Sequence, residues 1–187
     1  MTIRLSMLAL GVLAVGCGDD PVSYSDTVGI NLKAKSAETV GGTVTDDKAI
    51  TTESGNPYGA FVADATSAIG RDPGDIEVER VELLLGGSSI GVTTLGEVFT
   101  GTVEVLFQMN DTNNSYPVAS LDVPATTGGG PIALGVSFDG EAVSDVDYTK
   151  LLSGSFKVIL RGPAASGFDT KGADVDLQTT FTFSAFE

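Results

Sequence analysis

The sequence has no histidine, no tryptophan, a single cysteine and only 10 basic residues against 25 acidic ones. Without histidine, the chain has no base for Ser-His-Asp or Cys-His catalysis and none of the commonest zinc ligand. With one cysteine, it cannot form a disulfide within the chain. Without tryptophan, only the four tyrosines remain for stacking on a sugar ring. These gaps leave few catalytic mechanisms open, and we predict a non-catalytic protein with no cofactor.

The net charge of −15 restricts the partners that the chain can bind. Nucleic acid is held mainly by Lys and Arg that neutralise phosphates, and anionic lipid attracts basic surfaces. We therefore expect no nucleic-acid partner and no direct electrostatic binding to a membrane. Hydrophobic residues make up 42% of the chain and charged residues 19%, which is typical of a folded globular protein.

The first seventeen residues have the layout of a secretory signal peptide. Arg4 gives a positive start, an apolar run follows over residues 5–14, and small residues lead to Cys17. The run is too short to cross a bilayer as a stable helix. The ending Ala14-Val15-Gly16-Cys17 resembles the lipobox, the cleavage site of bacterial lipoprotein signal peptides. The common pattern has Leu three residues before the cysteine, whereas Leu13 stands four before it.

This resemblance implies that the sulfur of Cys17 is lipidated, that the peptide is cut before it, and that the new amino group is acylated with a fatty acid such as palmitate. Such an anchor is stable because each buried methylene contributes about 0.8 kcal/mol and several chains are present. Residues 1–16 are then the cleaved signal peptide, residues 17–25 the lipidated cysteine and its tether, and residues 26–187 one domain. Removal of Arg4 leaves nine basic residues against 25 acidic ones, a net charge near −16.

The residue after the cysteine bears on the destination of the protein. In enteric lipoproteins, an aspartate at this position favours retention in the inner membrane. Here Gly18 holds the position and Asp19 follows it. The resemblance therefore favours the outer membrane over the inner membrane of a bacterial envelope. The alternative is an ordinary signal peptide and a secreted protein without an anchor.

Alternation of apolar and polar residues predicts a mainly β domain. Strands are expected at residues 27–35, 40–45, 76–85, 100–109, 118–123, 132–138, 155–161 and 174–185. The last run is long enough to lie in the middle of a sheet. Seven or eight strands without a repeat of fixed period predict one antiparallel β-sandwich. An eight-stranded outer-membrane barrel is the alternative, but the lipobox, the 7% aromatic content and a predicted helix weigh against it.

One short helix is predicted after Asn56. Asn56 is suited to the N-cap, Pro57 to the first helical position and Gly70 to the stop, with apolar residues at helical spacing between them. Residues 95–99 are expected to form one helical turn. Residues 145–152 are expected to form one or two turns, with Asp145 as the cap.

Acidic and amide side chains gather in loops that can supply the six to eight oxygen ligands of calcium. The candidates are Asp72 with Asp75, and Asn110, Asp111 and Asn113 in one loop. Neither group has EF-hand spacing, and Asp and Asn also end strands by bonding to the local backbone. We favour this backbone role and keep calcium as the alternative. Paired carboxylates of a glycosidase can in principle be drawn from Glu77, Glu79, Glu82, Glu97 and Glu104.

Two functions follow from these observations. The first is a non-catalytic envelope lipoprotein with a membrane anchor, which is structural or binds a protein partner in the envelope. The alternative is a β-sandwich that binds a polysaccharide or small solute, with or without calcium. A concave pocket with converging polar groups and tyrosines favours a ligand. A free sheet edge or an exposed apolar patch favours a protein partner.

Replacing Cys17 by Ser is expected to release the protein from the membrane fraction or to block its maturation, because the sulfur that carries the lipid is lost. Cell fractionation with intact-mass spectrometry measures both effects. Ser6→Ala, inside the apolar run, is the control and should leave the processed mass unchanged. Membrane retention of the Cys17→Ser protein at the wild-type processed mass would contradict the prediction.

Overall fold

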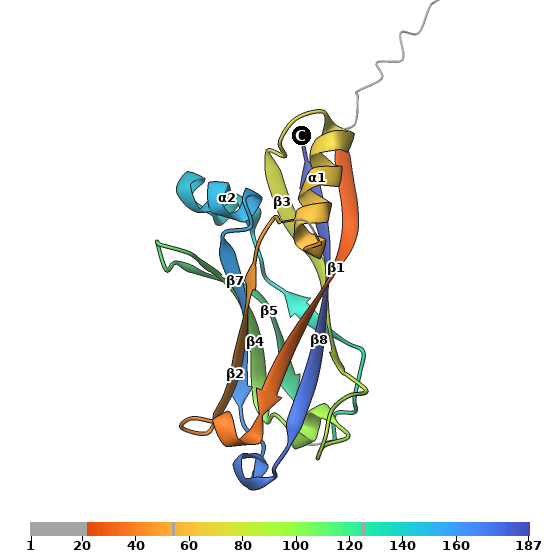
Figure 1. The fold of residues 1–187 in the computed structure, drawn as a ribbon, viewed down its shortest axis with the longest axis vertical. Helices are drawn as coiled ribbons and strands as arrows, with labels where there is room; N and C mark the ends of the chain where they lie inside the picture. The colour runs from red at the N-terminus through yellow and green to blue at the C-terminus, as the bar shows by residue number, and fades with distance from the viewer. Residues whose placement is uncertain (1–21, 54, 125) are drawn as a thin grey trace, which may run out of the picture.

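The computed structural model describes residues 22–53, 55–124 and 126–187. Eight strands form one antiparallel sheet in the order β1-β8-β3-β6-β5-β4-β7-β2 (Figure 1). The strands are β1 (Ser23–Lys35), β2 (Thr43–Ile50), β3 (Asp75–Leu85), β4 (Gly101–Met109), β5 (Ser115–Val123), β6 (Ile132–Val136), β7 (Phe156–Pro163) and β8 (Asp174–Phe186). The α-helices are α1 (Pro57–Ile69) and α2 (Asp145–Leu152). The predicted β class is confirmed, and α2 covers the residues that were expected to form one or two helical turns.

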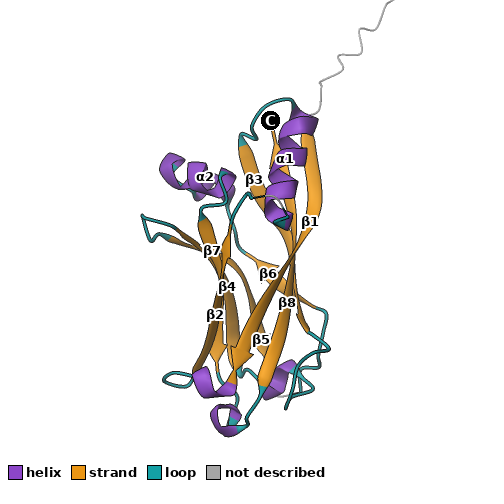
Figure 2. Ribbon diagram, in the orientation of Figure 1, coloured by secondary structure: helices purple, strands orange, loops and turns teal. Residues whose placement is uncertain are grey.

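The sheet folds over so that its two halves enclose one core (Figure 2). β8 is second and β4 sixth in the strand order. The rings of Phe107 on β4 and Phe183 on β8 nevertheless stack with their centroids 6.2 Å apart. Phe107 also meets Phe156 of β7 at 5.0 Å. Aromatic side chains from both halves therefore fill the space between them, as in a sandwich, although the strands belong to one nearly closed sheet.

The strand at the C-terminus lies inside the sheet, as its length predicts. β8 pairs with β1 on one side and with β3 on the other. β1 begins at Ser23, opposite Phe186, so residues 23–25 belong to the strand and not to the predicted tether. The predicted signal peptide and Cys17 lie outside the described residues.

The starts of β2 and β5 also differ from the prediction, and turn geometry explains the first difference. The second strand was expected at residues 40–45, but Gly41 and Gly42 have positive φ values of 58° and 74° and form the turn before β2. Glycine adopts this left-handed conformation without a side-chain clash. The strand expected at residues 118–123 is longer, because β5 already begins at Ser115.

A β-bulge in β3 reconciles its sequence with one buried face. Val78 lies opposite Phe183 and Arg80 opposite Thr182, so Glu79 has no partner across the ladder. The extra residue shifts the inward positions from even to odd numbers. The strand consequently buries Val78 before the bulge and Val81 after it.

Helix α1 forms as predicted. The side chain of Asn56 accepts a hydrogen bond from the backbone N–H of Tyr58 at 3.0 Å, Pro57 opens the helix, and Gly70 ends it with φ 85°. The helix buries Tyr58, whose ring meets Phe156 at 5.1 Å and Phe183 at 5.3 Å. In the described part of the chain, no helix has the length and apolar character needed to cross a membrane.

Replacing Phe181 or Phe183 by Ala is expected to lower the free energy of unfolding by about 3–5 kcal/mol, because a ring is lost and a cavity remains. Both side chains are at most 1% exposed. Thr180→Ala and Thr182→Ala, on the opposite face of β8, are the controls and should cost less than about 1 kcal/mol. Urea unfolding measures the differences. Equal losses at all four positions would show that the two faces are not distinct.

Candidate functional site

The two ends of the sheet, β1 and β2, leave an open seam. β1 has a ladder partner only in β8, and β2 only in β7, within the described residues. One hydrogen bond crosses the seam, from the backbone N–H of Lys33 to the carboxylate of Asp46 at 2.6 Å. Each of the two strands therefore keeps one edge without a ladder, which is the part of a sheet that can pair with another chain.

A groove of about 220 Å³ lies in the upper part of this seam. The buried side chains of Val28, Ile30 and Ile50 give it an apolar lining. Exposed Asn31 of β1 and Lys48 of β2 line it as well. The groove is smaller than the roughly 300–1,000 Å³ of typical small-molecule sites, so it suits one or two side chains better than a whole ligand.

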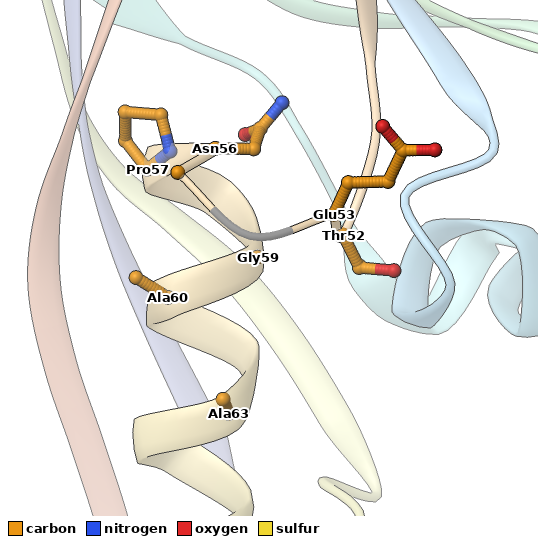
Figure 3. Close-up of a pocket in the computed structure, with 8 residues that line it drawn as sticks. Thr52, Glu53, Asn56, Pro57, Gly59, Ala60 and Ala63 are labelled. Carbon is orange, nitrogen blue, oxygen red and sulfur yellow. The ribbon is translucent and has the colours of Figure 1, made fainter.

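A larger cleft of about 510 Å³ adjoins the groove at the start of α1 (Figure 3). The groove and the cleft share Asn56 and Pro57. Ala60 and Ala63 contribute only methyl groups to the cleft, and Figure 3 shows the carboxylate of Glu53 directed away from them. The cleft therefore offers few polar groups that converge on a bound molecule.

Close contacts hold the loop between β2 and α1 in place. A Cβ at Gly59 would lie 2.8 Å from the Cα of Thr52, and a Cβ at Gly154 would lie 2.9 Å from its backbone nitrogen. The hydroxyl of Thr52 also donates to the carbonyl of Ser153 at 3.2 Å. The backbone of Thr52 thus lies between Gly59 and Gly154. Both positions require glycine, because a Cβ there would clash with the Thr52 backbone. The wall of the cleft formed by Thr52 and Gly59 is consequently closely packed.

Two lysines at the seam are without an ion pair. Nine of the ten basic residues lie in the described part of the chain, since Arg4 does not, and seven of these nine contact a carboxylate. Lys33 of β1 and Lys48 of β2 have no carboxylate oxygen within 4.0 Å of the ammonium group among the described residues. The free positive charge of a strongly acidic domain therefore lies along the seam.

The predicted calcium candidates of the β4–β5 loop have local partners. Asp111 pairs with Lys150 at 2.7 Å, and the amide of Asn110 donates to the hydroxyl of Ser155 at 3.1 Å. Asp111 and Asn113 have positive φ values of 65° and 56°, which Asp and Asn tolerate better than most residues. These residues shape the turn of the hairpin.

The other calcium candidates, Asp72 and Asp75, lie beside α2. Asp75 lines an acidic cleft of about 330 Å³ together with Glu141 and Asp145. Tyr148 also lines it and donates to the carbonyl of Pro73 at 2.9 Å. Burial, followed by the charges of Asp75 and Asp72, raises the pKa of Tyr148. No group of three or more metal-binding side chains comes together in residues 22–187, Ser54 and Ala125 aside.

The remaining carboxylates that sequence reasoning considered for catalysis are spread over the surface. Glu82, Glu97 and Glu104 pair with basic side chains, and Glu79 accepts a hydrogen bond from Ser184. The ammonium of Lys171 and the N–H and hydroxyl of Thr93 bond to Glu97 and lower its pKa to about 2. Glu97 therefore closes the capping box of a 3-10 turn, Leu95–Glu97, rather than facing a second acid.

The tyrosines offer no exposed stacking surface. Tyr58 is fully buried and donates to the carbonyl of Leu151 at 3.0 Å. Tyr116 donates to Asp147 at 2.7 Å, and Tyr24 packs on Phe61 with the ring centroids 6.1 Å apart. In the described residues, every Phe and Tyr is buried or half-buried. The aromatic groups therefore serve the core and its margins.

Sequence reasoning missed Asp147, a buried acid whose carboxylate accepts three side-chain hydrogen bonds. Its side chain is fully buried and accepts hydrogen bonds at 2.7 Å from Thr112, Asn114 and Tyr116 of the β4–β5 hairpin. Its own N–H donates to Ser144, which caps α2 in place of the predicted Asp145. The spacing Ser144-x-x-Asp147 resembles a capping box and is the signal that was available. Asp147 thus joins α2 to the hairpin.

No protein-family model matches the sequence, and no curated protein matches it significantly. The function has to be argued from the residues and their arrangement.

Asp147→Asn is expected to lower the free energy of unfolding by about 2 kcal/mol at pH 7. Burial raises the pKa of Asp147, but the bonds from Asn114, Thr112 and Tyr116 outweigh it and lower the pKa from 3.8 to about 2. A lowered pKa stabilises the folded state above about pH 4, and this stabilisation is lost as the pH falls towards 2. Urea unfolding across this range measures the change.

The control is Asp145→Asn, an exposed acid in the same first turn of α2. The Asp145→Asn variant should still lose most of the stability that the wild type loses between pH 4 and pH 2. The Asp147→Asn variant should lose less stability than the wild type over this range. The same pH dependence in both variants would contradict the assignment to Asp147.

Proposed function

We propose that this chain is a lipid-anchored protein of the bacterial envelope, held through Cys17, whose β-domain binds a protein partner without catalysing a reaction. The observation that carries the proposal is the seam, where β1 and β2 each keep an edge without a ladder. Free edges are the usual site of strand pairing between chains. The Ala14-Val15-Gly16-Cys17 ending supports the anchor.

The position of the domain relative to the anchor supports a partner in the same envelope. Ser23, the first residue of β1, follows Cys17 by six positions. A fully extended chain spans about 3.5 Å per residue, so the start of β1 stays within about 20 Å of the lipidated cysteine. The groove begins at Val28, in the same strand. A protein of the same membrane can therefore reach it. Gly18 supports the outer membrane as that membrane.

The distribution of side chains supports a protein partner over a polysaccharide. The described tyrosines are engaged in the core or in hydrogen bonds, and the cleft at the start of α1 has no aromatic side chain in its lining. A sugar-binding site normally offers aromatic faces and several converging polar groups. A strand edge beside an apolar groove instead offers backbone hydrogen bonds and a place for a side chain.

A photo-crosslinking side chain at Asn31 tests the proposal in living cells. Asn31 is exposed and lies on the free edge of β1. We expect it to capture an envelope protein, and we expect Cys17→Ser to abolish the adduct because the domain leaves the membrane. The matched control is Ala133, which is exposed on β6, a strand with partners on both edges. Adducts of equal yield at both positions, or at neither, would contradict the proposal.

A further inference from the structure

The backbone of β1 directs its free hydrogen-bonding groups into the groove. The N–H of Lys33 points across the seam, because it bonds to Asp46 of β2. Backbone groups alternate in direction along a strand, so those of Asn31 and Gly29 point to the same side as those of Lys33. No atom lies within 4 Å of a Cβ built on Gly29. The outer face of β1 is therefore uncovered at Gly29, and the edge of the strand beside it has no ladder partner among the described residues.

The groove supplies a place for a side chain next to that edge. A strand added to β1 would place alternate side chains towards the core and towards solvent. The inward side chain would meet Val28, Ile30 and Ile50, which are 1%, 6% and 4% exposed. At about 220 Å³, the groove accepts a side chain of moderate size. The inward positions of a bound segment are therefore apolar.

The positive charge at the seam favours acidic residues at the other positions of a bound segment. Lys33 and Lys48 have no carboxylate partner in the described part of the chain, although 25 acidic residues are present in the sequence. Lys48 follows the inward phase of β2, set by buried Val44 and Ile50, and is nevertheless exposed because it borders the seam. An inward lysine on an edge strand opposes pairing with a second copy, since two such edges bring like charges together. A carboxylate removes this repulsion.

We infer that the groove between β1 and β2 binds an extended segment of the partner in which acidic and apolar residues alternate, and that this segment adds as a strand to the free edge of β1. The inference rests on the proposed function for the partner being a protein. Backbone bonds to Gly29 and Asn31 hold the segment, and an apolar side chain enters the groove. An outward carboxylate of the segment meets Lys33 on the outer face of β1, and the exposed ammonium group of Lys48 reaches a carboxylate from the other side of the seam. The acidic charge of the rest of the domain keeps such a segment off other surfaces.

The test uses an end-capped, labelled peptide of eight residues that alternates Asp and Val, and the purified full chain, whether it is recovered from the membrane or the soluble fraction. Fluorescence anisotropy measures the Kd. We expect Lys48→Glu and Lys33→Glu each to weaken binding about tenfold, since each replaces an attraction by a repulsion. Arg80→Glu on β3 is the matched control, because it changes the net charge equally and lies on another strand. It should leave the Kd within about twofold.

Two further peptides separate strand addition from attraction between charges. A peptide that alternates Lys and Val should bind at least about tenfold more weakly. A peptide N-methylated at alternate residues should also bind more weakly, because it cannot form the ladder to β1. Equal binding of all three peptides, or equal losses in Lys48→Glu and Arg80→Glu, would overturn the inference.

No binding of the Asp-Val peptide up to millimolar concentration would also overturn the inference. It would indicate that the lysines serve to prevent the edge from pairing with a second copy. This outcome leaves the anchor and a crosslinked partner at Asn31 intact, so it is distinct from failure of the proposed function. Conversely, if the protein is released into the medium and still binds the peptide, the proposed lipid anchor is contradicted and the proposed binding groove is supported.

Discussion

The packing of aromatic rings across the interior is the interaction on which the rest of the domain depends. Phe183 of β8 contacts rings from α1 and from β4, and through them the two halves of the sheet meet. Burial of such rings contributes more than any single polar contact. No disulfide is available to a chain with one cysteine, so this core has to hold the domain. The folded-over shape of the sheet follows from it.

The seam follows from the same packing. Tyr58 and Phe61 hold α1 on the core, and the first turn of the helix contacts Thr52, just after β2. In Figure 1, α1 runs beside β1 above the end of β2. The helix thus covers the core where the two strands diverge, and it leaves their edges without a ladder. A domain that closed the sheet completely would have no edge to offer.

The charged residues of this domain fall into three groups with different roles. Most basic residues form exposed ion pairs, which contribute little to stability. Asp147 is different, because it is buried and its hydrogen bonds from the hairpin exceed the cost of burial. The seam lysines are different again, since neither ammonium group has a carboxylate oxygen within 4.0 Å among the described residues. Their charge remains available for recognition, whereas that of Asp147 is used within the fold.

The sequence by itself determined the elements whose signals are local. Alternation identified β1 and β8, Asn56-Pro57 and Gly70 bounded α1, and polar residues at turns marked most strand ends. These features depend on residues within a few positions of one another, so they can be inferred before any packing is known. The turn at Gly41-Gly42 and the bulge at Glu79 also depend on residues close together in the sequence, but they were not recognised from it.

Only the tertiary structure decided which strands are neighbours and which are not. β1 and β2 follow each other in the chain and would ordinarily pair, but β1 forms its ladder with β8 and β2 with β7. Val28, Lys48 and Ile50 share a groove only because the two strands form no ladder there, as Asp147 acquires three donors only through the hairpin. No local pattern encodes these contacts, because each joins residues far apart in sequence through the shape of the core.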